Sequence, residues 1–193
     1  QSHAGLSFDQ VIATCDITAM GTVRLLEIIP RLPNPPRVLH ASSSEIFGRP
    51  EASPQDETTP FRPVTPYGSA KAFATQMAGI YRKSFGLFVS NGIFYNHESP
   101  RRSENFVTQK ICRAAAAIKA GRQRELVLGS LDSRRDWGDA RDYVRGMWLA
   151  LQHSSPEDFV FGTGELHTVE DVVRVAFGAL DLDWRQWIRQ DPK

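Results

Sequence analysis

Apolar residues recur with helical spacing in five segments of the chain and form short uninterrupted runs in four others. The segments that predict helices are 8–29, 66–84, 106–120, 139–153 and 168–180. The runs that predict strands are 37–41, 87–94, 125–129 and 158–161. Helices and strands that alternate in this way favour an α/β fold with a doubly wound parallel sheet. The tail from Asp181 predicts no regular element.

Local signals set the two ends of one helix and the expected buried face of another. Thr65 is a suitable N-cap, and Pro66 suits the first helical position because its missing N–H would have no partner there. Gly86 ends the same helix, since glycine tolerates the left-handed backbone that closes helices. In the segment 139–153, Met147 and Trp148 lie on the predicted apolar side and are expected to pack against the core.

Composition and charge exclude several classes of function. At 193 residues, with 41% hydrophobic and 23% charged residues, the chain is an ordinary globular sequence with room for a sizeable core. The net charge of +1 gives no reason to expect nucleic acid or a membrane surface as partner. No apolar run approaches the roughly 20 residues of a membrane helix, and the first residues do not form a signal peptide. The two cysteines fit a reducing compartment, so we expect a cytoplasmic protein.

Four residues in two short motifs can carry proton and hydride chemistry. Tyr67 and Lys71 stand one helical turn apart, and an ammonium on the same helix face favours the phenolate form of the tyrosine. Ser43 and Glu45 stand in Ser-Ser-Ser-Glu, directly after a predicted strand. Each motif alone has a simpler interpretation, an exposed helix pair or a capping turn. Their order along the chain favours one site at the carboxyl ends of the strands, where such sheets bind ligands.

Two polar segments further along the chain have both a structural and a functional interpretation. Residues 96–102 form either a solvated loop or a phosphate clamp, because guanidinium groups match phosphate oxygens. Residues 134–142 either pair their own charges or present Arg135 to a diphosphate. We expect no metal site, because the neighbouring His97 and Glu98 do not share a helical face.

Taken in order, these pieces resemble the GDP-mannose 4,6-dehydratases, a family of the extended short-chain dehydrogenase/reductase superfamily. The matching motifs include Ala-Ser-Ser-Ser-Glu-Ile-Phe-Gly at 41–48, Pro-Tyr-Gly-Ser-Ala-Lys at 66–71, Asn-His-Glu-Ser-Pro-Arg-Arg at 96–102 and Arg-Asp-Trp-Gly at 135–138. The resemblance implies a partial Rossmann-like sheet that lacks its first βαβ units. It also implies that residues 1–95 form the later part of an NADP-binding domain, and that 96–193 mainly bind the GDP-sugar.

The resemblance also implies a role for each matching residue. The catalytic residues would be Ser43, Glu45, Tyr67 and Lys71. The residues that contact NADP would be Gln1, Ser2, Tyr67, Lys71, His97 and Arg102. The residues that hold GDP-mannose would be Asn96, Val107, Lys110, Gly129 and Arg135. The complete enzyme is expected to be a homo-oligomer, either a dimer or a tetramer.

Departures from the family pattern keep two alternatives open. No Gly-x-x-Gly-x-x-Gly loop follows a strand, so we expect a chain truncated at both ends relative to the family. Ser43 replaces the usual threonine and keeps its hydroxyl, whereas Phe47 and Ala13 replace tyrosines. One alternative is a catalytically inactive fragment that serves as a structural or interaction module. The other is a nucleotide-sugar epimerase or reductase of the same superfamily, against which Glu45 argues because those enzymes need no such base.

Overall fold

The computed structural model describes residues 4–191, and the chain divides into two compact units. Unit 1 comprises Gln1–Tyr95 and Asp142–Phe161, and unit 2 comprises Asn96–Arg141 and Gly162–Lys193. Each unit is therefore formed by two separate segments of the chain, and the segment Asp142–Phe161 of unit 1 lies in sequence between the two segments of unit 2. The functional division into a cofactor domain and a substrate domain stays a prediction.

Helices and strands alternate through most of the described chain. The helices are α1 (Leu6–Asp9), α2 (Val11–Thr14), α3 (Gly21–Ile28), α4 (Pro66–Phe85), α5 (Val107–Lys119), α6 (Ala140–Gln152) and α7 (Val169–Gly178). The strands are β1 (Val38–Ala41), β2 (Val89–Phe94), β3 (Asn96–Glu98), β4 (Leu126–Leu128), β5 (Arg134–Arg135), β6 (Trp137–Asp139), β7 (Asp158–Phe161), β8 (His167–Thr168) and β9 (Ile188–Gln190).

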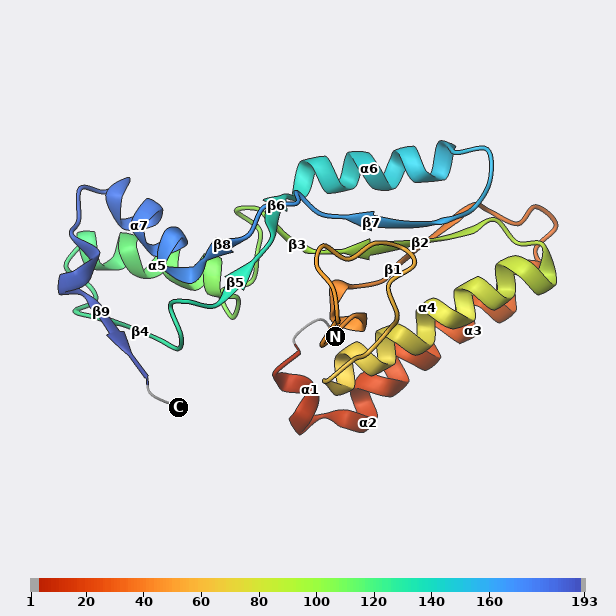
Figure 1. Cartoon of the computed structure of the whole chain (residues 1–193), viewed down its shortest axis with the longest axis horizontal. Helices are drawn as coiled ribbons and strands as arrows, with labels where there is room; N and C mark the ends of the chain where they lie inside the picture. The colour runs from red at the N-terminus through yellow and green to blue at the C-terminus, as the bar shows by residue number, and fades with distance from the viewer. Residues whose placement is uncertain (1–3, 192–193) are drawn as a thin grey trace. The chain divides into compact units, whose positions relative to one another are not determined.

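Unit 1 is built on a parallel sheet with the strand order β1-β2-β7. Helices α3 and α4 lie on one face of this sheet, and α6 lies on the other (Figure 1). All six residues of β2 are buried, as expected for a central strand that is covered on both faces. The α/β fold class with a partial, doubly wound parallel sheet is confirmed.

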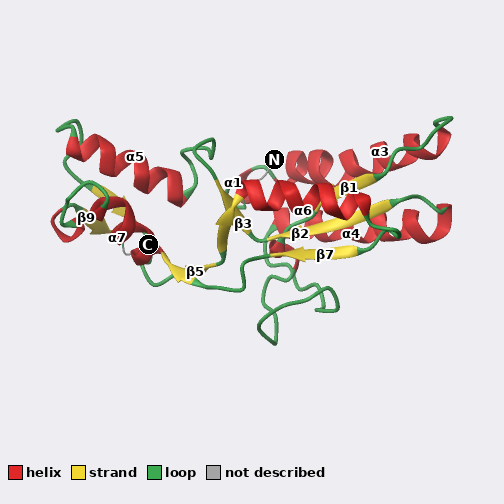
Figure 2. Cartoon of the chain, turned by 90° about the horizontal axis from the view of Figure 1, so that it is seen from above, coloured by secondary structure: helices red, strands yellow, loops and turns green. Residues whose placement is uncertain are grey.

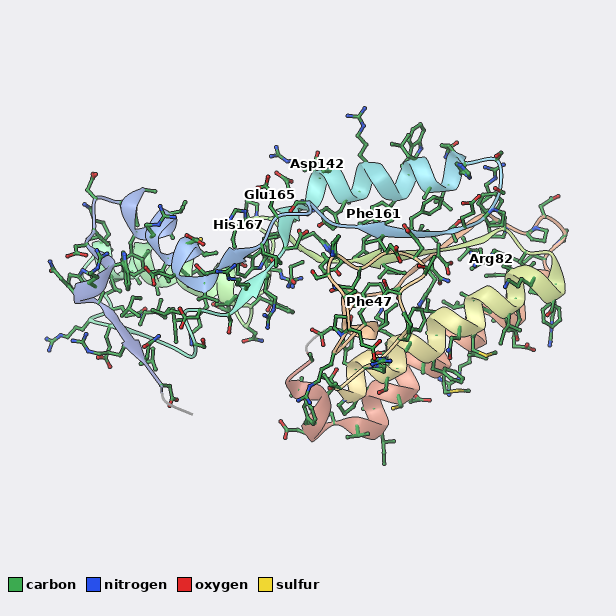
Figure 3. The ribbon with its side chains drawn as sticks, in the orientation of Figure 1. Phe47, Arg82, Asp142, Phe161, Glu165 and His167 are labelled. Carbon is green, nitrogen blue, oxygen red and sulfur yellow. The ribbon has the colours of Figure 1, made fainter. Side chains whose placement is uncertain are left out.

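The two faces of the sheet pack differently. On the α4 face, Ala78 and Tyr81 pack with Val89 of the central strand. On the α6 face, the rings of Phe94 and Phe161 lie 4.7 Å apart between their centroids. Figure 3 labels Phe161 on β7, beneath α6. Gly146 lets α6 approach closely, since a Cβ atom there would lie 2.5 Å from the Phe161 ring.

The predicted boundaries of the long helix are confirmed, but the predicted first helix is not continuous. Thr65 caps α4 by accepting a hydrogen bond from the Gly68 amide at 2.9 Å, and Gly86 ends the helix with φ of 65°. The segment predicted as one helix over 8–29 is broken at Gln10, where φ is −131° and ψ is 51°. A π-helical stretch then covers Cys15–Met20 before α3 begins.

The predicted apolar face of α6 is wrong. Trp148 is 61% exposed, whereas Tyr143 and Ala150 are buried against the sheet. The close approach at Gly146 decides which face turns inward, because Tyr143, Gly146 and Ala150 follow each other at helical spacing. Trp148 lies outside this stripe, and Met147 is only partly buried.

Unit 2 has its own core between α5, α7 and a pair of short strands (Figure 2). Ile111 and Ile118 of α5 pack there with Val173 and Phe177 of α7. The prediction that the tail has no regular element is wrong, because β9 pairs in parallel with β4. Two further pairs complete the unit, β3 with β6 in parallel and β5 with β8 antiparallel.

Candidate active site

The loop after β1 presents the two residues of the first predicted motif. Ser43 caps a short 3₁₀ turn over Ser44–Ile46, and its hydroxyl oxygen accepts a hydrogen bond from the Glu45 amide at 3.3 Å. The side chains of Ser43 and Glu45 are both partly buried. Phe47, two residues after Glu45, is 2% exposed and anchors this loop in the core (Figure 3).

The first turn of α4 presents the second motif. Tyr67 is 7% exposed, and its amide donates a hydrogen bond to the hydroxyl oxygen of the fully buried Ser7 at 3.1 Å. The Lys71 ammonium nitrogen lies 5.8 Å from the centroid of the Tyr67 ring. At this distance the positive charge favours a negative charge on the phenol oxygen.

Lys71 is bound to the end of strand β1. Its Nζ atom donates a hydrogen bond to the Ala41 carbonyl oxygen at 2.7 Å. Burial lowers the pKa of the Lys71 ammonium. Burial also lowers the pKa of the neighbouring His40 to about 4, with the charge of Lys71 adding to that shift and Asp158 opposing it.

A close backbone approach joins the loop to the helix. A Cβ atom at Gly68 would lie 2.6 Å from the Glu45 carbonyl oxygen and 3.1 Å from the Thr65 hydroxyl oxygen. Glycine is therefore the residue that lets the Ser-Ser-Ser-Glu loop contact the helix turn that carries Tyr67. Unit 1 thus brings together the backbones of the two predicted catalytic motifs. The catalytic roles themselves stay predictions.

The remaining predicted residues lie in unit 2, apart from two at the amino end. Gln1 and Ser2 lie outside the described residues. The others are Asn96 and His97 on β3, Arg102 in the following loop, Val107 and Lys110 on α5, Gly129 after β4, and Arg135 on β5. Their convergence with the residues of unit 1 on one ligand stays a prediction.

Several of these unit 2 side chains have protein partners. Arg102 stacks over the Phe106 ring at 3.5 Å from its centroid, and its Nε atom lies 3.4 Å from a Glu98 carboxylate oxygen. The Lys110 ammonium donates a hydrogen bond to the Val127 carbonyl oxygen at 2.8 Å. Arg135 is exposed and donates to the carbonyl oxygen of the preceding residue. An anionic ligand bound by Arg102 would therefore compete with the Glu98 carboxylate for the guanidinium group.

Sequence reasoning missed the role of Asp136, which lies in the Arg-Asp-Trp-Gly motif. Its buried carboxylate accepts hydrogen bonds from the Thr163 amide at 2.8 and 3.0 Å, the Thr163 hydroxyl at 2.9 Å and the Gly164 amide at 2.8 Å. The carboxylate thus holds the Thr-Gly-Glu turn in place. The sequence contains Arg-Asp-Trp-Gly at 135–138 and Thr-Gly-Glu at 163–165, but neither segment indicates that the two are in contact.

Within residues 4–191, no group of three or more His, Cys, Asp or Glu side chains could hold a metal ion. No helix in the same range combines the length and apolarity required to cross a bilayer.

Comparison with known proteins identifies relatives over the whole chain. A family model described as GDP-mannose 4,6 dehydratase matches residues 1–192. The chain is 47% identical over 197 residues to GDP-mannose 4,6 dehydratase 2 of Arabidopsis thaliana, an alignment that covers 100% of the chain and 52% of that protein. It is 48% identical over 179 residues to GDP-mannose 4,6 dehydratase of Homo sapiens, covering 92% of the chain and 48% of that protein. The chain therefore spans about half the length of the curated relatives it matches.

Solved structures share the fold at lower sequence identity. The structure of RMD from Pseudomonas aeruginosa complexed with NADPH superposes with a TM-score of 0.91 at 23% identity, covering 100% of this chain and 66% of that one. DesIV, a dTDP-glucose 4,6-dehydratase from Streptomyces venezuelae with NAD and TYD bound, gives 0.88 at 24% identity, covering 100% and 58%. At these identities the likeness establishes the fold alone.

Proposed function

The chain belongs to the GDP-mannose 4,6-dehydratase family, and we propose that the protein containing it converts GDP-mannose to GDP-4-keto-6-deoxymannose. The observation that carries this proposal is the contact between the two motifs in unit 1. The Glu45 carbonyl packs against Gly68, and Lys71 binds the carbonyl of Ala41 at the end of β1. A carboxylate, a hydroxyl and an activated phenol can then act on one hexose ring.

We propose NADP as the cofactor, and the donor groups at the site suit it. An ammonium has three N–H donors, and the Ala41 carbonyl accepts one of those of Lys71, so others can bind ribose hydroxyls. Tyr67, Lys71, His97 and Arg102 would hold the cofactor, together with Gln1 and Ser2. When bound, NADP supplies the acceptance and return of a hydride, so the reaction needs no external oxidant.

The chain's own residues account for the proton transfers. The Tyr67 phenolate takes the proton of the sugar's 4-hydroxyl, and the Ser43 hydroxyl hydrogen-bonds to the same oxygen. A ketone at C4 acidifies the hydrogen on C5, which the Glu45 carboxylate removes. Glu45 then gives that proton to the departing 6-hydroxyl, so that one water is lost and the carboxylate is restored. Once a hydride has returned to C6, C5 takes a proton from solvent, and Tyr67 releases to solvent the proton that it accepted from the 4-hydroxyl. Each such transfer contributes about 10²–10⁴-fold to the rate.

Basic side chains in unit 2 support a diphosphate ligand. Lys110, Arg113 and Arg122 line a cavity of about 560 Å³. Arg113 is paired with Glu104 at 2.9 Å, so the cavity holds a partly compensated positive charge. A diphosphate carries the charge that such a cavity attracts. A dimer or tetramer and a cytoplasmic location stay predictions.

A direct assay tests the proposal. Purified protein containing this chain is incubated with GDP-mannose in deuterated water, and the nucleotide sugar is analysed by mass spectrometry and NMR. We expect loss of one water and one solvent-derived deuterium at C5. Binding of NADP and GDP-mannose without any dehydration would refute the proposed activity, whereas binding of neither would favour the structural or interaction module.

A further inference from the structure

A row of buried polar side chains runs from Ser42, directly after β1, through Thr75 of α4 to Asn91 of β2, and Thr75 lies one helical turn beyond Lys71. Ser42 is 5% exposed, Thr75 is 2% exposed and Asn91 is fully buried. Polar groups in such surroundings are costly unless they form hydrogen bonds. The partners of these three side chains therefore show what the row does.

The hydroxyl hydrogens in this row can be assigned by counting. Thr75 donates its hydroxyl hydrogen to the Lys71 main-chain carbonyl at 2.8 Å. A hydroxyl has a single hydrogen, so in the 2.6 Å contact between Ser42 and Thr75 the donor must be Ser42. The resulting chain of donation runs from Ser42 to Thr75 and from Thr75 to Lys71.

This chain closes a ring around Lys71. The Lys71 ammonium binds the carbonyl of Ala41, and Ala41 is covalently joined to Ser42. The main chain of Lys71 is bound through Thr75 to the side chain of that same Ser42. Both ends of the lysine are thus tied to two consecutive residues at the end of β1. The amide of Ser42 is itself fixed to β2, where it donates to the Gly92 carbonyl at 2.8 Å.

The other side of Thr75 is bound to the sheet as well. Asn91 donates to the Thr75 carbonyl at 3.2 Å and to an Asp158 carboxylate oxygen at 2.8 Å. Arg82 binds that carboxylate oxygen at 2.8 Å, farther along α4 (Figure 3). The helix is therefore held against all three strands by polar contacts at defined positions.

We propose that Thr75 and Ser42 are positioning residues that fix the Lys71 ammonium relative to Tyr67 and so set the pH at which the phenol ionises. The inference rests on the proposed function, in which that phenol is the base. The ammonium lies 5.8 Å from the ring centroid, and at an effective dielectric constant of about 20 each added ångström weakens its effect on the titration by about 0.3 pH unit. A shift of one or two ångströms is thus measurable.

The test is an ultraviolet titration of Tyr67 in protein containing this chain, without substrate, with the matching Tyr67→Phe protein subtracted in each background. Thr75→Val keeps the shape of the side chain and removes the hydroxyl, so we expect Tyr67 to ionise about 0.3–0.5 pH unit higher. Ser42→Ala should shift the titration in the same direction, which keeps the test decisive if Thr75→Val does not fold. Thr75→Ser retains the hydroxyl and should titrate like the parent.

A matched control separates positioning from stability. Ser90 is fully buried in the same sheet, and its hydroxyl accepts from the Glu157 amide at 3.3 Å, away from Lys71. Ser90→Ala should lower the thermal stability without moving the Tyr67 titration. If Thr75→Val and Ser42→Ala lose stability while Tyr67 ionises at the parental pH, the two residues are merely structural and the proposal is overturned. Since no substrate is present, this outcome is independent of whether the protein dehydrates GDP-mannose.

Discussion

His40 should make the free energy of unfolding depend on pH in a range where few other groups titrate. Its imidazole is buried on β1, and burial, followed by the charge of Lys71, lowers its pKa from 6.5 to about 4. Between these two values the unfolded chain binds a proton at His40 that the folded chain does not. Stability is therefore unaffected above pH 6.5 and falls as the pH drops below it.

The size of the effect follows from that shift. Between pH 8 and pH 5, His40 should lower the free energy of unfolding by about 2 kcal/mol. With a urea dependence of about 2 kcal/mol per molar, the midpoint of unfolding should fall by about 1 M. Most carboxylates still bind few protons at pH 5, so the His40 imidazole should contribute most of the change in the free energy of unfolding between pH 8 and pH 5.

The assay is urea unfolding followed by far-ultraviolet circular dichroism, at several pH values between 5 and 8. His40→Gln keeps a polar side chain but cannot titrate, so its midpoint should vary with pH by about 1 M less than that of the parent. His153→Gln is the matched control, because His153 is a half-exposed imidazole at the surface of the same unit. If the midpoint of the parent and that of His40→Gln fall equally between pH 8 and pH 5, the buried imidazole is not the cause of the pH dependence.

Four further predictions concern the site and its support. Tyr67→Phe should abolish dehydration of GDP-mannose while calorimetry shows unchanged binding of the nucleotide sugar; residual turnover near the parental rate would remove Tyr67 from the mechanism. Glu45→Gln should permit oxidation at C4 but block elimination, so that reduced cofactor accumulates in a single turnover, and normal dehydration would contradict its role. Gly68→Ala should lower the free energy of unfolding by about 1–3 kcal/mol, because the new Cβ atom would clash with the Glu45 carbonyl oxygen. Gly79→Ala on the same helix is the control, and thermal unfolding should show it to be neutral or stabilising. Asp136→Asn should lower the free energy of unfolding by about 1–3 kcal/mol, because the NH2 group of the new side chain would face the amide N–H groups of Thr163 and Gly164. An unchanged midpoint of thermal unfolding would argue against the contact between Asp136 and this turn.

The parts of the fold that local chemistry determines could be predicted from the sequence. Thr65, Pro66 and Gly86 each satisfy a need of one helix end, and no distant residue has to be known to recognise them. The same holds for the strands that became β1, β2 and β7, which the short apolar runs at 37–41, 87–94 and 158–161 predicted, and all six residues of the central β2 are buried.

The parts that depend on distant contacts could not be predicted. Strand β9 has only three residues and is stabilised by its pairing with β4, about sixty residues earlier along the chain. The exposed face of α6 follows from a glycine that meets Phe161, which periodicity alone does not reveal. The contact of Glu45 with Gly68 is of the same kind, since each motif shows its residue types but neither shows that they touch.

The neutral state of His40 has a consequence for the candidate site itself. Lys71 owes its influence on Tyr67 to a positive charge in partly buried surroundings, where a charge acts more strongly than in water but is also harder to keep. A second positive charge on the neighbouring strand would make that ammonium harder still to maintain. Because the pKa of His40 is about 4, its imidazole stays uncharged at neutral pH and does not oppose Lys71. The burial that makes the protein less stable in acid therefore also removes a charge that would oppose the Lys71 ammonium. In the proposed mechanism that ammonium acts on Tyr67, so His40→Lys should reduce turnover more than His40→Gln does at neutral pH.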